Sequence, residues 1–512
     1  MTLLTDLSGF SDAQTHFSKA RLWELFDGSR EQLNMTHECL DRHRNKGISI
    51  RIAHADGGDD FYSLEQVSDA ANRVANWLVE QGVAKGDRVA LMLEPSLAFY
   101  ATLFGAMKSG AVAVPMFTLF GPEALRLRVQ DCAPVMLVSA AEKLDVARTS
   151  GVSRVLEGAE LLELSAACSN VFTASTSADD MALYQYTSGT TRELPEAVKH
   201  RHRAVVTVAV AALYATGVRP NELFMCPSSP AWGHGLAHGT LGPLGLGASI
   251  ASYAGPFDAS RLLRAMSDYR VNNLSAAATH YRMMRQCDTA QELPFSLEKL
   301  SFTGEPLDAP TAQWAADTFG HEVCSIYGST EVGVVLANYP GALDLPVKRG
   351  SLGKAMPGLN VAVLNTAGSH CAVDEVGEIS VARRDGWFGI KDLGHVDAEG
   401  YFYHDGRADD VIITAGWTIS AREVEQAILA HAGIAEAAAI GVPDEVRGQV
   451  IKAFVVPRPD VQVDITDIQN FVKQHSSAHA YPRIVEIVAA LPKTPAGKVN
   501  RRVLRQIESG NN

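Results

Sequence analysis

The sequence predicts an α/β protein with a large N-terminal domain and a small C-terminal α+β domain. Its 512 residues exceed the usual size of one domain, so at least two packed units are expected. Up to about residue 340, strand-like and helical patterns alternate with short turns, which is typical of a parallel sheet covered on both faces. After residue 350, glycine and proline become frequent and the strand-like runs become short. This change in composition and in strand length indicates that the C-terminal part of the chain has a different architecture.

The N-terminal part begins its regular pattern with a helix expected over residues 64–81, where apolar side chains recur at helical spacing. Ser63 and Gln66 fit a capping box at its start, and Gly82 fits its end. The pattern continues with a buried strand, a helix and two more strands, expected over residues 88–93, 97–108, 111–115 and 135–139.

The C-terminal part predicts a smaller unit that mixes strands and helices. A helix is expected over residues 420–432, with Ser420 and Glu423 as a second capping box. Strands over 435–442 and 450–457 and a helix over 465–475 complete the pattern. We place the domain boundary near residue 409, which predicts domains 1–408 and 409–512.

Composition excludes several classes of function. Lys and Arg total 45 against 58 Asp and Glu, a net charge of −13, so nonspecific nucleic-acid binding is disfavoured. The seven cysteines form no CxxC pair, which argues against a structural zinc site. The N-terminus does not resemble a signal peptide, and the most apolar segment, Ala204–Ala215, is shorter than the ~20 residues that span a bilayer. We therefore expect a cytoplasmic protein without an integral membrane segment.

The most informative stretch lies at residues 183–202. An apolar run ends at Tyr186, and a helical pattern starts at about His202. Hydroxyl side chains and exposed backbone N–H groups around one glycine can wrap an anion such as a triphosphate. An ordinary hydroxyl-rich turn is the alternative, and the pattern is not a Walker P-loop because GxxxxGK[ST] is lacking. The candidate phosphate-binding residues are Thr187, Ser188, Gly189, Thr190 and Thr191.

Further motifs follow this loop in a fixed order: FTGEPL (302–307), IYGSTEVG (326–333), DLGHVDAEGYFYHDGRADD (392–410) and LPKTPAGKVNRR (491–502). Together with TSGTT they resemble the signature motifs of the adenylate-forming enzymes, which include acyl- and aryl-CoA synthetases, peptide-synthetase adenylation domains and luciferases. The resemblance covers residues 35–505. It implies stacked, doubly wound sheets in the large domain and a small, mobile C-terminal domain. It also implies ATP, Mg²⁺ and coenzyme A as co-substrates.

The resemblance assigns roles to individual residues. Lys498 would bridge the acid and the α-phosphate, Thr330 would contact that phosphate, and Glu331 would hold Mg²⁺. Asp392 would accept hydrogen bonds from both ribose hydroxyls. Arg407 would reach ribose or phosphate, the alternative being a salt bridge at the domain boundary. The nucleotide-binding set is completed by Gly304, Glu305, Pro306, Tyr327, Gly328 and Ser329, although Tyr327 could instead be a core aromatic.

The acid and the thiol are expected to meet beside SPAWGHGLAHG (229–239). His234 could assist thiol deprotonation, with a structural histidine as the equal alternative. Gly416 and Trp417 would line the coenzyme A tunnel, and Asp409 would be the hinge between the domains. The acyl pocket is predicted to be lined by Trp232, Gly233, His234, Gly328 and Gly333.

Two residues depart from the family pattern. Arg192 stands where the phosphate loop has a glycine, and Glu196 stands near the usual lysine. A carboxylate close to a triphosphate is electrostatically unfavourable, so Glu196 either points away or is offset by a neighbouring cation.

These observations predict an ATP-dependent carboxylic acid–CoA ligase whose partners are a small acid, ATP and CoA, working as a monomer or a homodimer. The acid is expected to be medium-chain, alicyclic or aromatic, because Gly328 replaces the large aromatic residue of the acetate-specific branch. One alternative is a stand-alone adenylating enzyme that loads a carrier protein. The other is a nucleotide-binding homologue that has lost its chemistry, which Arg192 and Glu196 would favour.

Overall fold

The computed structural model describes residues 2–186, 196–329, 332–407, 411–414, 417–444, 448–459, 461–475, 481–493 and 499–510. The chain divides into two compact units. The first comprises Met1–Gly328 and Gly333–Gly358, and the second comprises Ser329–Val332 and Leu359–Asn512. The domain boundary predicted at residue 409 falls on positions outside the described residues, so it stays a prediction.

One sheet of the first unit has the strand order β6-β5-β3-β4-β7-β8. Its strands run parallel except β8, which pairs antiparallel with β7 at the edge. The central strands β3, β4 and β5 are mostly apolar and are buried except at Arg88, as expected of a parallel sheet covered on both faces, which confirms the predicted parallel sheet. The strands are β3 (Arg88–Met92), β4 (Val112–Pro115), β5 (Met136–Ser139), β6 (Val155–Glu157), β7 (Met181–Gln185) and β8 (Val198–Arg201).

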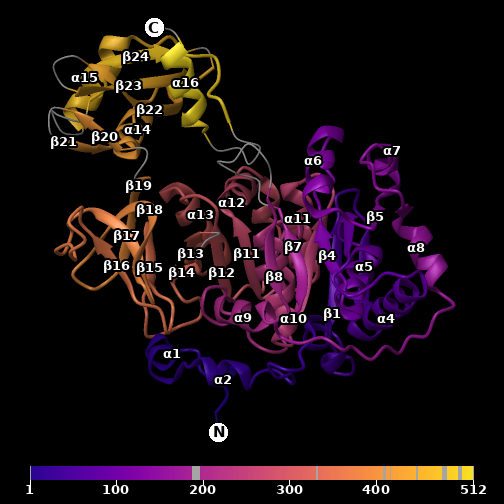
Figure 1. The fold of residues 1–512 in the computed structure, drawn as a ribbon. Coiled ribbons are helices and arrows are strands. Elements are labelled where there is room, and N and C mark those ends of the chain that lie inside the picture. The colour runs from indigo at the N-terminus through magenta and orange to yellow at the C-terminus, as the bar shows by residue number, and fades with distance from the viewer. Residues whose placement is uncertain are drawn as a thin grey trace. The chain divides into compact units, whose positions relative to one another are not determined.

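A second sheet in the same unit follows the order β15-β14-β13-β12-β11-β9-β10-β1-β2. Strands β13 to β1 run parallel, whereas the β1–β2 and β14–β15 pairs are antiparallel. The carboxyl ends of β9, β11, β12 and β13 therefore lie along the same edge of the sheet. Figure 1 shows β11, β12 and β13 side by side. The strands are β1 (Ser49–His54), β2 (Asp59–Ser63), β9 (Leu223–Met225), β10 (Ser249–Ala254), β11 (Asn273–Ala277), β12 (Lys299–Thr303), β13 (Val323–Ser329), β14 (Gly333–Ala337) and β15 (Ser351–Ala355).

Helix α4 (Leu64–Glu80) has the predicted capping box: Ser63 accepts from the backbone of Gln66, whose side chain accepts from the backbone of Ser63. Its apolar face packs on α5 (Leu97–Ser109), and Gly105 permits this close approach. The other helices of this unit are α1 (Phe10–His16), α2 (Lys19–Trp23), α3 (Met35–Cys39), α6 (Pro122–Cys132), α7 (Leu144–Arg148), α8 (Gly158–Ser165), α9 (Ala204–Tyr214), α10 (Gly242–Gly245), α11 (Ala259–Asp268), α12 (Ala278–Arg285) and α13 (Ala309–Phe319).

The second unit mixes strands and helices, as predicted for the C-terminal part. Strands β16 (Val361–Leu364), β17 (Gly377–Arg383), β18 (Gly386–Val396) and β19 (Phe402–Arg407) form an antiparallel meander. A separate sheet joins β22 (Ile434–Asp444), β23 (Gly448–Pro457) and β24 (Ile484–Ile487). Its core is aliphatic and includes Val424, Ile428 and Val472. The remaining elements are β20 (Val411–Thr414), β21 (Trp417–Ser420), α14 (Ala421–Leu429), α15 (Ile465–His475) and α16 (Arg501–Gly510).

Among the helices that the structure describes, none combines the length and the hydropathy needed to cross a membrane.

Candidate active site

The predicted site residues of the first unit lie at or after the carboxyl ends of parallel strands in the order β13-β12-β11-β9. The loop after β9 leads to Trp232 and His234, β12 ends just before Gly304, and Tyr327 lies near the end of β13. In open α/β sheets, ligands bind at this edge because strand-to-helix loops converge there. The sheet order thus brings together residues that lie about 100 positions apart in the sequence.

The loop after β12 is held in place by one arginine. Arg282 on α12 forms an ion pair with Glu305 at 2.6 Å and donates to the carbonyl of Pro306 at 2.9 Å. Thr279 donates to the same carboxylate at 2.9 Å. Gly304 has a φ of +98°, and a Cβ at that position would meet no atom of the described residues within 4 Å. The loop therefore presents an open backbone face, against which a planar ring could lie.

Gly328 does not provide the pocket volume that the sequence suggested. A Cβ at this position would overlap the carbonyl oxygen of Gly333 and lie 2.8 Å from the Cα of Val334. The space beside Gly328 thus belongs to the backbone that follows the β13 turn, and it is not free for a larger acid. This corrects the expectation that the missing side chain at Gly328 enlarges the acyl pocket. Gly333, by contrast, has a φ of +70°, and none of the atoms that the structure describes lies within 4 Å of a Cβ placed there, so they do not block its assignment to the pocket wall.

His234 opens a π-helical segment, His234–Leu241, of the kind often found at functional sites. Its Nδ1 lies 2.9 Å from the hydroxyl of Ser228, and its Nε2 lies 2.9 Å from the hydroxyl of Ser275. Burial, together with the nearby His238 and His280, lowers the pKa of His234 to about 3, so the ring is neutral at pH 7. With both nitrogens engaged by serines, the geometry favours the structural alternative, and a role toward the thiol stays a prediction.

Gly233, one of the residues predicted to line the acyl pocket, lies beside the end of β7. A Cβ on Gly233 would meet the side chain of Gln185 at 3.6 Å, and Gln185 is the last residue of that strand. Trp232 packs edge-to-face against Phe117, with ring centroids 5.6 Å apart. The end of β7 and Gly233 of the predicted acyl pocket are therefore neighbours within this unit.

Residues on both flanks of the predicted phosphate loop contact a carboxylate that the sequence analysis missed. Asp131 on α6 accepts from the hydroxyl of Tyr186 at 2.7 Å and from the backbone N–H of Ala197 at 3.2 Å. A lone aspartate near a helix end gives no sequence signal of this contact. Glu196, the departure from the family pattern, is solvent-exposed.

In the second unit, the two predicted ribose residues lie opposite each other. Asp392 on β18 and Arg407 on β19 are direct partners in the antiparallel ladder. The side chain of Asp392 is mostly buried, and its Oδ1 lies 3.8 Å from Nε2 of His404. Lys391, just before it, has a φ of +62°, so the strand is irregular where this carboxylate is placed. Adjacent strands thereby hold both residues at one point of the meander.

Several predicted residues lie outside the described part of the chain: Thr187, Ser188, Gly189, Thr190, Thr191, Arg192, Thr330, Glu331, Asp409, Gly416 and Lys498. For Arg407 and Trp417 the structure describes the backbone alone. Ser329 closes β13. The roles of all these residues stay predictions.

Comparison with known proteins decides the family. The AMP-binding enzyme family matches residues 41–386, and the AMP-binding enzyme C-terminal domain matches residues 423–498. The chain belongs to the AMP-binding enzymes.

Relatives of this AMP-binding enzyme extend over nearly its whole length. An acetyl-coenzyme A synthetase of Bacillus subtilis is 29% identical, and the alignment covers 98% of this chain and 96% of the relative. An uncharacterized acyl-CoA ligase of the same organism is 31% identical, covering 93% and 96%. The ATP-bound crystal structure of MatB from Rhodopseudomonas palustris superposes with a TM-score of 0.81 at 26% identity, covering 93% of this chain and 98% of that one.

This AMP-binding enzyme is an ATP-dependent member of the acyl-CoA ligases, with ATP, Mg²⁺ and coenzyme A as co-substrates. The residues present suit a nucleotide: the open face at Gly304 fits a planar base, and the Asp392 carboxylate fits ribose hydroxyls. In the described part of the chain, no group of three or more His, Cys, Asp or Glu side chains could hold a metal ion. Glu331, the predicted Mg²⁺ ligand, lies outside it.

Asp392→Ala is expected to raise the KM for ATP about 10- to 100-fold, because two hydrogen bonds to a buried carboxylate would be lost at ~1.5–3 kcal/mol in total. Steady-state kinetics with varied ATP checks this, with Asp385→Ala at the exposed β17–β18 turn as the matched control. An unchanged KM for ATP in folded Asp392→Ala enzyme would contradict the ribose assignment.

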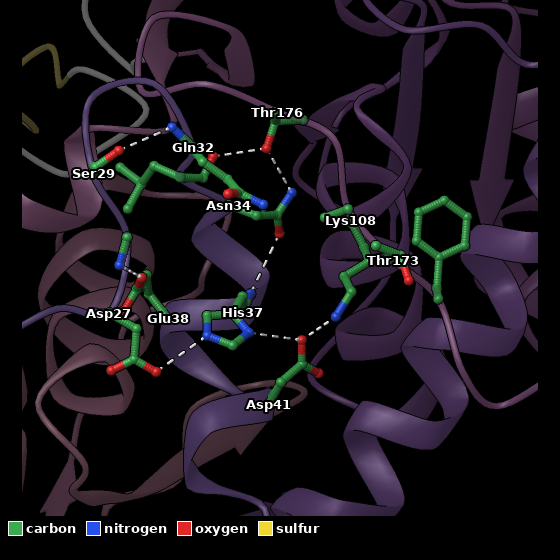
Figure 2. Close-up of a pocket in the computed structure, with 14 residues that line it drawn as sticks. Asp27, Ser29, Gln32, Asn34, His37, Glu38, Asp41, Lys108, Thr173 and Thr176 are labelled. Atoms are coloured by element: carbon green, nitrogen blue, oxygen red, sulfur yellow. Dashed lines mark hydrogen bonds and ion pairs between the residues drawn. The ribbon is translucent and has the colours of Figure 1, made fainter.

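A cavity of about 570 Å³ in the first unit was not anticipated from the sequence (Figure 2). In it, His37 on α3 bridges two carboxylates: Nε2 lies 3.2 Å from Asp27, and Nδ1 lies 3.5 Å from Asp41. Lys108 on α5 pairs with Asp41 from the other side. Burial alone would raise the pKa of Asp41, but His37 and Lys108 lower it to about 2. The network ties α3 and the preceding segment to α5.

His37 should make stability depend on pH. The hydrogen bond to Asp41 raises the pKa of His37 above its unfolded value of about 6.5. Its contribution is therefore present in full below about pH 6.5 and is lost as the pH rises through the folded pKa. His37→Gln should lower Tm most near pH 6 and least near pH 9, measured by thermal denaturation against the exposed His321→Gln. A Tm difference that is the same at both pH values would contradict this assignment.

Proposed function

We propose that the chain activates a carboxylic acid with ATP and transfers the acyl group to coenzyme A. The observation that supports this most is the position of residues 229–234, 304–306 and 327–328, which lie at or after the carboxyl ends of β9, β12 and β13 in one parallel run of strands. These are the segments to which the family resemblance assigns the acid and the adenine.

The reaction has two steps. A carboxylate oxygen attacks the α-phosphorus, the bond from that phosphorus to the bridging oxygen breaks, and pyrophosphate leaves. The thiolate sulfur of coenzyme A then attacks the acyl carbon of the adenylate, and AMP leaves. Lys498 stabilises the charge that moves between the acid and the α-phosphate, and Asp392 fixes the ribose. Bound Mg²⁺ would neutralise phosphate charge.

The acid is proposed to be medium-chain, alicyclic or aromatic. Support comes from the aromatic pair Trp232 and Phe117 beside the exposed Gly233, because such rings favour contact with an apolar acyl group. Gly328 no longer supports this class, because its side-chain space is filled by the backbone of Gly333. Acetate, the acid of one named relative, is therefore the competing substrate.

Pyrophosphate exchange across a panel of acids tests the proposal. The panel should run from acetate through hexanoate and cyclohexanecarboxylate to benzoate, each followed by thioester formation with free coenzyme A. Fastest exchange with hexanoate, cyclohexanecarboxylate or benzoate is the expected result. Fastest exchange with acetate would overturn the proposed acid class while leaving the ligase assignment intact.

Two other results would favour the alternatives. Exchange without transfer to free coenzyme A would indicate an enzyme that loads a carrier protein. No exchange with any acid would favour a homologue that has lost its chemistry. The hinge at Asp409, the tunnel residues Gly416 and Trp417, the cytoplasmic location and the oligomeric state stay predictions.

A further inference from the structure

His404 on β19 faces Asp392, the carboxylate predicted to bind the ribose. Its Nε2 lies 3.8 Å from Oδ1 of Asp392, and both side chains are mostly buried, with 19% and 12% of their surface exposed. This separation is longer than a hydrogen bond, so the contact is electrostatic. The motif that predicted Asp392 and Arg407 also contains His404, for which it implies no role.

Arg422 on α14 fixes which nitrogen of His404 carries the proton. Its Nη1 donates to Nδ1 of the ring at 2.8 Å and to the backbone carbonyl of the same residue at 2.9 Å. A guanidinium can only donate, so Nδ1 must be the acceptor and carries no proton. The proton of the ring is therefore on Nε2, the nitrogen that faces Asp392. The geometry thus aims an N–H group at the carboxylate.

The surroundings of Arg422 make this restraint a lasting one. Arg422 and His404 belong to the same compact unit, in which α14 packs on β19. Burial lowers the pKa of the Arg422 guanidinium, whereas the nearby Asp405 and Glu425 raise it. Because arginine stays charged at neutral pH, its hydrogen bond to Nδ1 holds the ring in one tautomer.

We propose that His404 is a positioning residue for the nucleotide, acting through Asp392, with Arg422 setting its tautomer. This rests on the proposed function, in which Asp392 binds the ribose of ATP. An N–H group aimed at Oδ1 favours one orientation of the carboxylate, because such an attraction is weakly screened at a mostly buried site. The carboxylate then meets the ribose hydroxyls in an orientation that it already has, which reduces the ordering that binding requires.

Equilibrium titration with the Mg²⁺ complexes of ATP, 2′-deoxy-ATP and 3′-deoxy-ATP tests this inference. Each analogue lacks one ribose hydroxyl, so the wild type should bind it about tenfold more weakly than ATP. His404→Leu should weaken ATP about fivefold and reduce the preference for ATP over each analogue to about twofold, because a misoriented carboxylate gains less from either hydroxyl. General damage to the site would instead weaken all three nucleotides equally and leave the preference unchanged.

Two further variants separate the N–H group from the bulk of the ring. His404→Gln keeps an N–H donor and should keep the preference for ATP within about twofold of the wild type. Arg422→Met frees Nδ1 to hold the proton and should reduce the preference in the same direction as His404→Leu. In the double variant the two losses should not add, because both act through one N–H group.

His431 provides the matched control, since it is a histidine of the same unit that also lies beside a carboxylate. Its Nε2 lies 3.1 Å from Oδ2 of Asp467. His431→Leu should keep the wild-type preference for ATP over both analogues. A wild-type preference in His404→Leu would overturn the inference, as would an equal loss of affinity for all three nucleotides.

Asp392→Ala distinguishes this failure from failure of the ribose assignment. If Asp392→Ala removes the preference for ATP and His404→Leu keeps it, the ribose assignment stands and the positioning role is wrong. If Asp392→Ala keeps the wild-type preference, the ribose assignment itself is wrong, and the inference falls with it. The titrations need no acid, so a failure of the proposed acyl transfer would appear separately, in the pyrophosphate exchange.

Discussion

Replacing Lys498 by alanine is expected to reduce adenylate formation about 10²- to 10³-fold, since one well-placed charge in a transition state contributes ~3–4 kcal/mol. Thioester formation from supplied acyl-adenylate should be nearly unchanged, because the lysine is proposed to serve the first half-reaction alone. Pyrophosphate exchange measures the first step, and coenzyme A transfer from the purified adenylate measures the second.

A neighbouring lysine in the same motif provides a matched control. Lys493 pairs with Glu436 at 2.8 Å, so its charge already has a structural partner. Lys493→Ala should therefore keep most pyrophosphate exchange. If Lys498→Ala slows both half-reactions equally, or if the two lysine variants behave alike, the assigned role of Lys498 is wrong.

Gly328→Ala is expected to lower kcat/KM for ATP about 10²-fold. The added methyl group would overlap the carbonyl of Gly333 and press on Val334, so the backbone after β13 must move. Displacement of catalytic groups by about 1 Å can cost about 10²-fold in rate. Thr330 and Glu331, predicted to act at the triphosphate, lie between Gly328 and Gly333 in the sequence, so we expect a backbone shift there to impair their proposed roles. Steady-state kinetics, with circular dichroism to confirm folding, tests this expectation.

Gly121→Ala is the control for this substitution. Gly121 has an ordinary φ of −75°, and a Cβ there would meet no atom within 4 Å. The variant should keep kcat/KM within about threefold of wild type, since N-cap glycine to alanine costs ~1 kcal/mol or less in stability. Near-normal kinetics in Gly328→Ala would mean that a side chain fits beside Gly328. This space could then again be part of a pocket for an acid larger than acetate.

Local sequence patterns were sufficient for the elements whose signals are short-range. The apolar spacing and the Ser63–Gln66 capping box predicted α4, which ends at Glu80 as expected. The strand over 135–139 and the helix over 465–475 were also confirmed, with small shifts at the boundaries. These signals suffice because helix caps and side-chain periodicity depend on residues a few positions apart.

The family motifs also predicted which segments bind nucleotide and acid, because each motif is contiguous. Asp392 and Arg407 were both predicted from one such stretch, and the β18–β19 ladder places them opposite each other. The sequence alone therefore determined the α/β class and the family, and it proposed most of the candidate site.

Tertiary structure decided what depends on distant segments. The strand order that sets β9 beside β11 and β11 beside β12 brings the site loops together. The overlap at Gly328 shows that the pocket volume predicted there is filled by backbone. The serines on both sides of His234 favour a structural role for this residue over thiol deprotonation. The tie from Asp131 to Ala197 spans 66 residues. Such contacts have no local sequence signature, because packing and backbone hydrogen bonding set which distant residues meet.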